Sequence, residues 1–236
     1  MTAGTLHRTD ASAPRIVEGM PLAAEGAVSA ALGGYSRDYL VSGLRAINPA
    51  QRLRLRFSGR GVEIAAGRAR VGLRGVAYGR GAALGAAGPA RMSVHNNSVK
   101  YRFRRFTEWF ENGPQGLEQG FDVAAPPSVG RESLTFALTL TGGTSARLRR
   151  GALLLTGEGS SLRYGGLIAT DADGHLLHSW LQLVGDRLLI RVDDRGARYP
   201  LRIDPFVQRS ELSATRGASG EEFGESVAVS GRTLVV

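Results

Sequence analysis

The sequence predicts an all-β protein. In many short segments, apolar residues alternate with polar ones at every second position, which is the pattern of a strand with one buried face. These segments are separated by Gly or Asp turns at a spacing of roughly ten residues, which is typical of a β-sandwich or barrel. No segment keeps a helical period, so we expect a low helix content.

The predicted elements follow one another from residue 29 onward. Residues 1–28 are poor in large apolar residues and rich in Ala, Thr, Gly and Pro, which predicts a mobile leader. The leader also lacks the apolar stretch of a signal peptide, so an export signal would have to lie upstream or have been removed. The strands expected after it include Arg52–Phe57, Val62–Ile64, Val71–Leu73, Val99–Phe103, Thr107–Phe110, Leu134–Leu140 and Leu188–Val192.

Composition sets further limits. The 236 residues suffice for one large or two small domains, and no apolar run is long enough to span a membrane as a helix. The absence of cysteine excludes disulfides and Cys-based zinc sites. The net charge of +9 comes almost entirely from arginine, since Lys100 is the only lysine. This excess fits either an anionic partner such as nucleic acid or a compositional bias toward GC-rich codons.

A weak internal repeat occurs at an offset of 91 residues. The apolar pattern from Val62 to Pro114 recurs without a gap in the second half, and Gly75 then aligns with Gly166. The repeat favours two similar β-sandwich-like domains in tandem, at residues 29–125 and 126–206. The Pro-rich stretch from Ala125 to Ser128 would mark the boundary between them.

The last twenty residues carry a more specific motif. Phe-Gly, Ser-Val-Ala and a turn glycine occur in order before a strand that starts at Thr233. The segment resembles the FG-GAP repeat of integrin α-chains and of bacterial surface and secreted proteins. The matching residues are Phe223, Gly224, Ser226, Val227, Ala228 and Gly231. The resemblance implies that residues 207–236 begin a β-propeller blade and stop before it is complete. A propeller needs about 4–8 blades, so we expect further blades downstream.

The middle of the chain resembles the module that precedes the repeats in bacterial FG-GAP proteins. Thr107, Glu108 and Trp109 open this match, and Asn112-Gly113-Pro114 and the run from Gly116 to Phe121 continue it. Further matches are the Arg163–Leu167 stretch, Asp171–Gly174, and the sequence from Ala197 through Pro205. The resemblance implies a non-catalytic structural or adhesion module that caps or presents the propeller. Its implied partners are the downstream propeller and an extracellular protein or glycan, without nucleic acid and without membrane insertion.

Asp171 and Asp173 are the candidate metal ligands. They form an Asp-x-Asp-Gly sequence, which is part of the pattern of a calcium loop. Position five of an EF-hand would be His175 and position twelve Gln182, which departs from that pattern. The alternative interpretation is a hairpin turn in which Asp and Gly supply the turn geometry. We therefore assign no cofactor to this chain, and calcium is expected only in downstream blades.

Glu108, Trp109 and Glu118 carry the alternative function. Two carboxylates beside an aromatic ring are the groups with which a protein binds a sugar or cleaves a glycoside. This hypothesis requires Trp109 to be exposed in a groove. The competing interpretation places Trp109 in the core of a sandwich and the glutamates on its solvent face. No residue is assigned a catalytic role, and we expect the protein not to be an enzyme.

Overall fold

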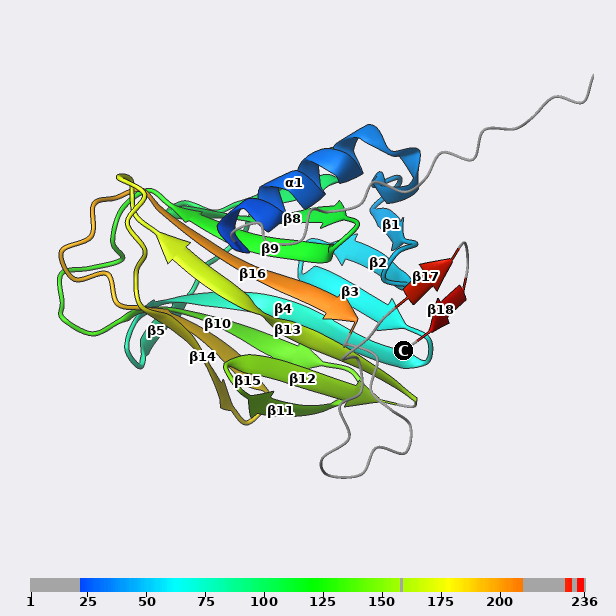
Figure 1. Cartoon of the computed structure of the whole chain (residues 1–236). Coiled ribbons are helices and arrows are strands. Elements are labelled where there is room, and N and C mark those ends of the chain that lie inside the picture. Colours follow the sequence, from blue (N-terminus) through cyan, green and yellow to red (C-terminus); the bar gives the residue numbers. More distant parts are fainter. Residues whose placement is uncertain (1–21, 158, 210–227, 231–232, 236) are drawn as a thin grey trace, which may run out of the picture.

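The computed structural model describes residues 22–157, 159–209, 228–230 and 233–235. Two antiparallel sheets of eight strands each pack face to face (Figure 1). Sheet A has the order β1-β2-β3-β4-β10-β15-β14, and β5 pairs with β4. Its strands are β1 (Arg45–Asn48), β2 (Leu53–Ser58), β3 (Gly61–Ala66), β4 (Ala69–Arg80), β5 (Ala83–Ala86), β10 (Leu134–Thr141), β14 (Ser179–Val184) and β15 (Arg187–Val192).

Sheet B has the order β11-β12-β13-β16-β9-β8-β7-β6. Its strands are β6 (Arg91–His95), β7 (Ser98–Arg102), β8 (Phe106–Gly113), β9 (Gly116–Val123), β11 (Ser145–Arg149), β12 (Ala152–Gly157), β13 (Ser160–Thr170) and β16 (Leu201–Arg209). The all-β prediction is therefore confirmed.

Alternation along the strands builds the core. In β2, Leu53, Leu55 and Phe57 are buried, whereas the arginines between them are exposed. Apolar side chains from both sheets meet in one continuous cluster. Within it the ring of Phe121 stacks on that of Phe136, with their centroids 4.3 Å apart. Such burial stabilises a fold by about 25 cal/mol per Å² of apolar surface.

The expected division into two tandem domains is wrong. Strand β10 lies after the proposed boundary, yet it pairs with β4 from before it. Strand β16 likewise pairs with β9. Residues 29–125 and 126–206 thus contribute to the same two sheets and to one core. Strand β10 is hydrogen-bonded to β4 and β15, and β16 to β13 and β9. Separating the two ranges would break these hydrogen bonds, so the two ranges form one sandwich.

The 91-residue repeat is nevertheless present in this sandwich. Strands β3 and β4 in sheet A correspond at that offset to β12 and β13 in sheet B. Gly75 and Gly166 both have positive φ, at 60° and 68°, and both lie at a break in strand register. The two copies of the repeat therefore face each other from opposite sheets instead of forming separate domains.

Helix α1 (Leu22–Tyr35) was not predicted, and it corrects the expectation that the leader extends to residue 28. The helix lies across β8 and β9 (Figure 1). It contacts sheet B through small residues: a Cβ added to Gly33 would lie 2.1 Å from the carbonyl oxygen of Asn112. A helix that packs through glycines carries no stripe of large apolar residues, so periodicity could not reveal it. A short 3-10 helix, η1 (Arg37–Tyr39), follows.

The C-terminal strands β17 (Ala228–Ser230) and β18 (Thr233–Val235) form an antiparallel pair. Val229 pairs with Leu234 and Ser230 with Thr233. Residues 1–21 of the predicted leader lie outside the described residues, as do Phe223, Gly224, Ser226, Val227 and Gly231 of the FG-GAP motif.

Candidate functional site

The three candidate ligand-binding residues do not share one surface. Side chains alternate along β8, so Glu108 points into the sandwich with Phe106 and Phe110, while Trp109 points to the opposite face, under α1. Glu118 of β9 also lies under the helix, since a Cβ on Gly26 would come 2.5 Å from its Oε1. Glu108 and Glu118 are thus separated by the sheet and cannot flank one substrate.

Trp109 is fully buried, with only 1% of its surface exposed. Its indole ring covers Gly120 on β9, where an added Cβ would lie 1.9 Å from Cζ2 of the ring. The guanidinium of Arg202 lies 4.3 Å from the ring centroid, in a cation–π contact. The carbohydrate hypothesis required an exposed Trp109, and this burial contradicts it.

Glu108 belongs to a buried hydrogen-bonded chain. Nε2 of Gln119 donates to Oε1 of Glu108 at 2.7 Å, and the hydroxyl of Tyr164 donates to Oε1 of Gln119 at 2.7 Å. Burial raises the pKa of Glu108 to about 7, although the hydrogen bond from Gln119 acts to lower it. Glu108 also lines a cavity of about 330 Å³ between β4 and β7. These hydrogen bonds join side chains of β8, β9 and β13, and they therefore hold the three strands together.

A pair of carboxyl groups lies beneath α1. Glu118 lies close to Asp204 of the neighbouring strand β16, and neither oxygen of Glu118 nor Oδ1 of Asp204 has a hydrogen-bond partner among the described residues. Burial, followed by the neighbouring carboxyl group of Asp204, raises the pKa of Glu118 well above its ordinary value. Burial also raises the pKa of Asp204. Glu118 therefore holds its proton to higher pH than an ordinary carboxyl group does.

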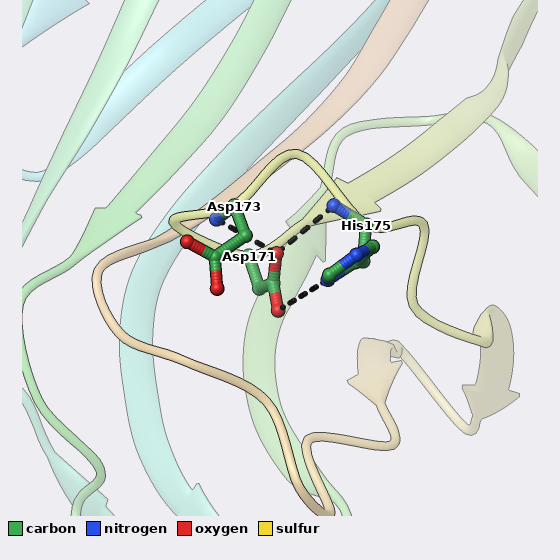
Figure 2. Close-up of side chains that lie close together, drawn as sticks. All are labelled: Asp171, Asp173 and His175. Carbon is green, nitrogen blue, oxygen red and sulfur yellow. Dashed lines mark hydrogen bonds and ion pairs between the residues drawn. The ribbon is translucent and has the colours of Figure 1, made fainter.

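Asp171, Asp173 and His175 lie together in the loop after β13 (Figure 2). One carboxylate oxygen of Asp171 accepts hydrogen bonds from the backbone N–H groups of Asp173 and His175, at 3.0 and 2.9 Å. Its other oxygen lies 3.4 Å from Nδ1 of His175. Asp173 pairs with Arg198 at 2.8 Å.

The pKa of Asp171 reflects these loop contacts. Desolvation acts to raise it, but the backbone hydrogen bonds from His175, Arg198 and Asp173 outweigh that effect, so the pKa is lowered. The Asp171 carboxylate thus closes a tight loop, which is the role that the hairpin-turn interpretation predicts for it. The ligand atoms of the three side chains lie within 4.8 Å of one another, so the calcium alternative stays a prediction.

Sequence reasoning missed two buried polar residues. Asp194 pairs with Arg80 and accepts a hydrogen bond from the hydroxyl of Tyr199 at 2.6 Å. The side-chain amide of Asn112 in β8 donates to the carbonyls of Tyr39 and Ile47 at 2.9 and 2.7 Å. Neither residue has a sequence signal that separates an exposed polar side chain from a buried one, because its partners are distant in the sequence.

The comparison with known families concerns the C-terminal end of the chain. Residues 206–236 match the FG-GAP repeat. The match begins inside β16 and includes β17 and β18, so the last strand of the sandwich and the first residues of the repeat overlap. The resemblance stated from the sequence is therefore confirmed for this segment. No curated protein and no solved structure is significantly similar to the chain. Among the described residues, no helix has the length and apolarity needed to cross a membrane.

Proposed function

We propose that this chain is a non-catalytic structural and adhesion module of a secreted or surface-exposed bacterial protein, in which the sandwich caps or presents FG-GAP repeats. The observation that carries the proposal is the overlap between the repeat and β16. This strand lies inside sheet B, where β13 and β9 hold it on both sides.

Because of this overlap, the first residues of the repeat are held in a central strand of sheet B. Val207 pairs with Leu117 on one side and with Tyr164 on the other, and it is 1% exposed. The chain thus enters the repeat from a residue locked in the core. A module that presents binding loops needs such a base, because a flexible tether would let their orientation vary.

The carboxyl groups of the sandwich support a non-catalytic role. A glycosidase holds two carboxyls roughly 5–9 Å apart across a cleft that admits the substrate. Here Glu118 is buried beside Asp204 beneath α1, and Glu108 accepts a hydrogen bond from Gln119 inside the core. The two glutamates lie on opposite faces of sheet B, and neither is exposed to a substrate. The proposed partners are accordingly further repeats of the same polypeptide and an extracellular protein or glycan, with calcium bound only in such repeats.

The structural part of the proposal is tested by removing residues 210–236. We expect the shortened chain to unfold within about 2 °C of the intact chain, since the sandwich holds its own core. A fall of more than about 10 °C would show that these residues complete the sandwich instead of being carried by it.

The adhesion part is tested with microspheres coated with the intact chain. We expect them to be retained on immobilised extracellular matrix proteins or polysaccharides more strongly than microspheres coated with albumin. Equal retention on all such surfaces would contradict the adhesive role while leaving the structural role standing.

A further inference from the structure

The outer face of sheet A carries a hollow of about 420 Å³ over β1, β2 and β3. Four arginines surround it, Arg45, Arg54, Arg56 and Arg70, against the single acidic residue Glu63. The strand register explains the grouping, because it places Arg45 opposite Arg56, and Ala65 opposite both Arg54 and Arg70. The alternation in β2 that buries the core leucines thus forces its arginines onto this one surface.

The positive charge of this hollow is compensated only in part. Glu63 pairs with Arg70 at 3.8 Å and with Arg74 at 3.7 Å. Arg45, Arg54 and Arg56 are exposed and have no ion pair or hydrogen bond from their side chains to any residue that the structure describes. Cβ atoms directly opposite on antiparallel strands are about 5 Å apart, and like charges there destabilise a sheet. Arg56 also lies opposite Glu63 of β3, but the carboxylate of Glu63 pairs with Arg70 and Arg74 instead. The repulsion between Arg45 and Arg56 is thus not offset by an ion pair, and an anion bound between them would relieve it.

The lining of the hollow selects among anions. Guanidinium groups bind carboxylate, sulfate and phosphate oxygens through paired hydrogen bonds. A single-stranded nucleic acid would also need aromatic side chains on which its bases stack, and no aromatic residue lines this hollow. Ile47, which is 55% exposed, instead provides an apolar surface on which the carbons of a sugar ring can lie.

We infer that this hollow binds an acidic oligosaccharide, with Arg45, Arg54 and Arg56 receiving its carboxylate or sulfate groups. The inference rests on the proposed adhesive function and names the class of partner. It places recognition on the outer face of sheet A, whereas Glu108 points into the sandwich and Trp109 and Glu118 lie under α1 on sheet B.

The test is a binding titration of the intact chain with fluorescent heparin and oligogalacturonate oligosaccharides. We expect binding to at least one of them, weakened as the salt concentration rises because exposed charges are screened. Arg45→Gln/Arg56→Gln is expected to weaken binding by about tenfold or more, which corresponds to the loss of two charge-assisted contacts.

The matched control is Arg147→Gln/Arg149→Gln, which removes the same charge from exposed positions on β11. We expect it to change affinity less than about twofold. Equal weakening by both variants would mean that overall charge alone attracts the sugar, and would overturn the inference. Tighter binding of a single-stranded oligonucleotide than of either sugar would overturn it too. If neither sugar binds while the coated microspheres still adhere, the assignment of the hollow as the binding site is wrong and the proposed function stands.

A second readout does not depend on the ligand. Because Arg45 and Arg56 repel each other, the Arg45→Gln/Arg56→Gln variant without ligand is expected to unfold about 1–2 °C above the original chain. Higher stability together with weaker binding is the signature of a functional site. A variant that unfolds at a lower temperature would show that the two arginines stabilise the sheet, and would remove the premise of the inference.

Discussion

The guanidinium of Arg80 makes two hydrogen bonds to the carboxylate of Asp194, at 2.7 and 2.8 Å, across 114 residues of sequence. The same guanidinium donates to the backbone carbonyls of Ser128 and Glu132. It thereby ties the end of β4 to the Pro-rich stretch and to the loop after β15. The segment expected to separate two domains is instead fastened to both halves of one sandwich.

Removing Asp194 should destabilise the protein strongly. The side chains of Arg80 and Asp194 are 10% and 3% exposed, so Asp194→Ala leaves a buried charge without its partner. We expect a loss of about 3 kcal/mol in the free energy of unfolding, measured in urea. The adjacent Asp193→Ala is the control, because Asp193 pairs with the exposed Arg195 and should cost less than about 1 kcal/mol. Similar losses in both variants would contradict the assignment.

The carboxyl pair under α1 should make stability depend on pH. Because the pKa of Glu118 is raised in the folded chain, its stabilising effect is complete below the ordinary carboxyl pKa and is lost as pH rises through the raised value. The raised pKa of Glu108 acts in the same direction. We expect the free energy of unfolding to fall between pH 6 and pH 9.

Glu118→Gln isolates the contribution of the pair. The buried amide is uncharged at every pH, so the variant should be more stable than the original chain at pH 9 by about 2 kcal/mol, with a flatter pH profile. Chemical unfolding at a series of pH values measures this. An unchanged slope would mean that Glu118 is already ionised in the folded protein.

Gly120 should tolerate no side chain. A Cβ there would lie 1.9 Å from the ring of Trp109, which is packed under α1. We expect Gly120→Ala to cost about 3 kcal/mol and to shift the tryptophan emission to longer wavelength as the ring is displaced. Gly143→Ala is the control, since nothing lies within 4 Å of its added Cβ. A Gly120→Ala variant with the original emission spectrum would refute this packing.

The two repeat glycines should respond alike. Gly75 and Gly166 have positive φ, and neither would meet a close contact from an added Cβ, so alanine brings backbone strain alone. We expect each substitution to cost about 1–2 kcal/mol in thermal unfolding. Gly85→Ala, at a position without positive φ, should be close to neutral. A cost at one glycine only would argue against equivalent roles in the two copies.

The sequence predicted those features of the fold that depend on short-range residue patterns. Alternation identified β2 with its buried face, and it identified β10 as a strand, although Thr135 and Ala137 between the apolar residues of β10 are buried as well. The 91-residue offset matched β3 with β12 and β4 with β13. It could not predict which sheet each copy would join, because strand order depends on pairing between distant segments. Helix α1 was missed because Gly26 and Gly33 form its contact surface.

The prediction of candidate site residues was limited in the same way. Glu108 and Trp109 are adjacent in sequence, so alternation in a strand should have separated them onto opposite faces. The opposed arginines Arg45 and Arg56 could not be found, because the register of β1 against β2 is known only from the fold.

The central claim is that residues 22–157 and 159–209 form a single sandwich whose last strand overlaps the FG-GAP match. Hydrogen exchange followed by mass spectrometry at increasing urea concentrations tests it most directly. We predict that peptides from β4 and from β13, which come from the two copies of the repeat, lose their protection at the same urea concentration. Loss of protection in one copy while the other remains fully protected would contradict the claim and restore the two-domain arrangement.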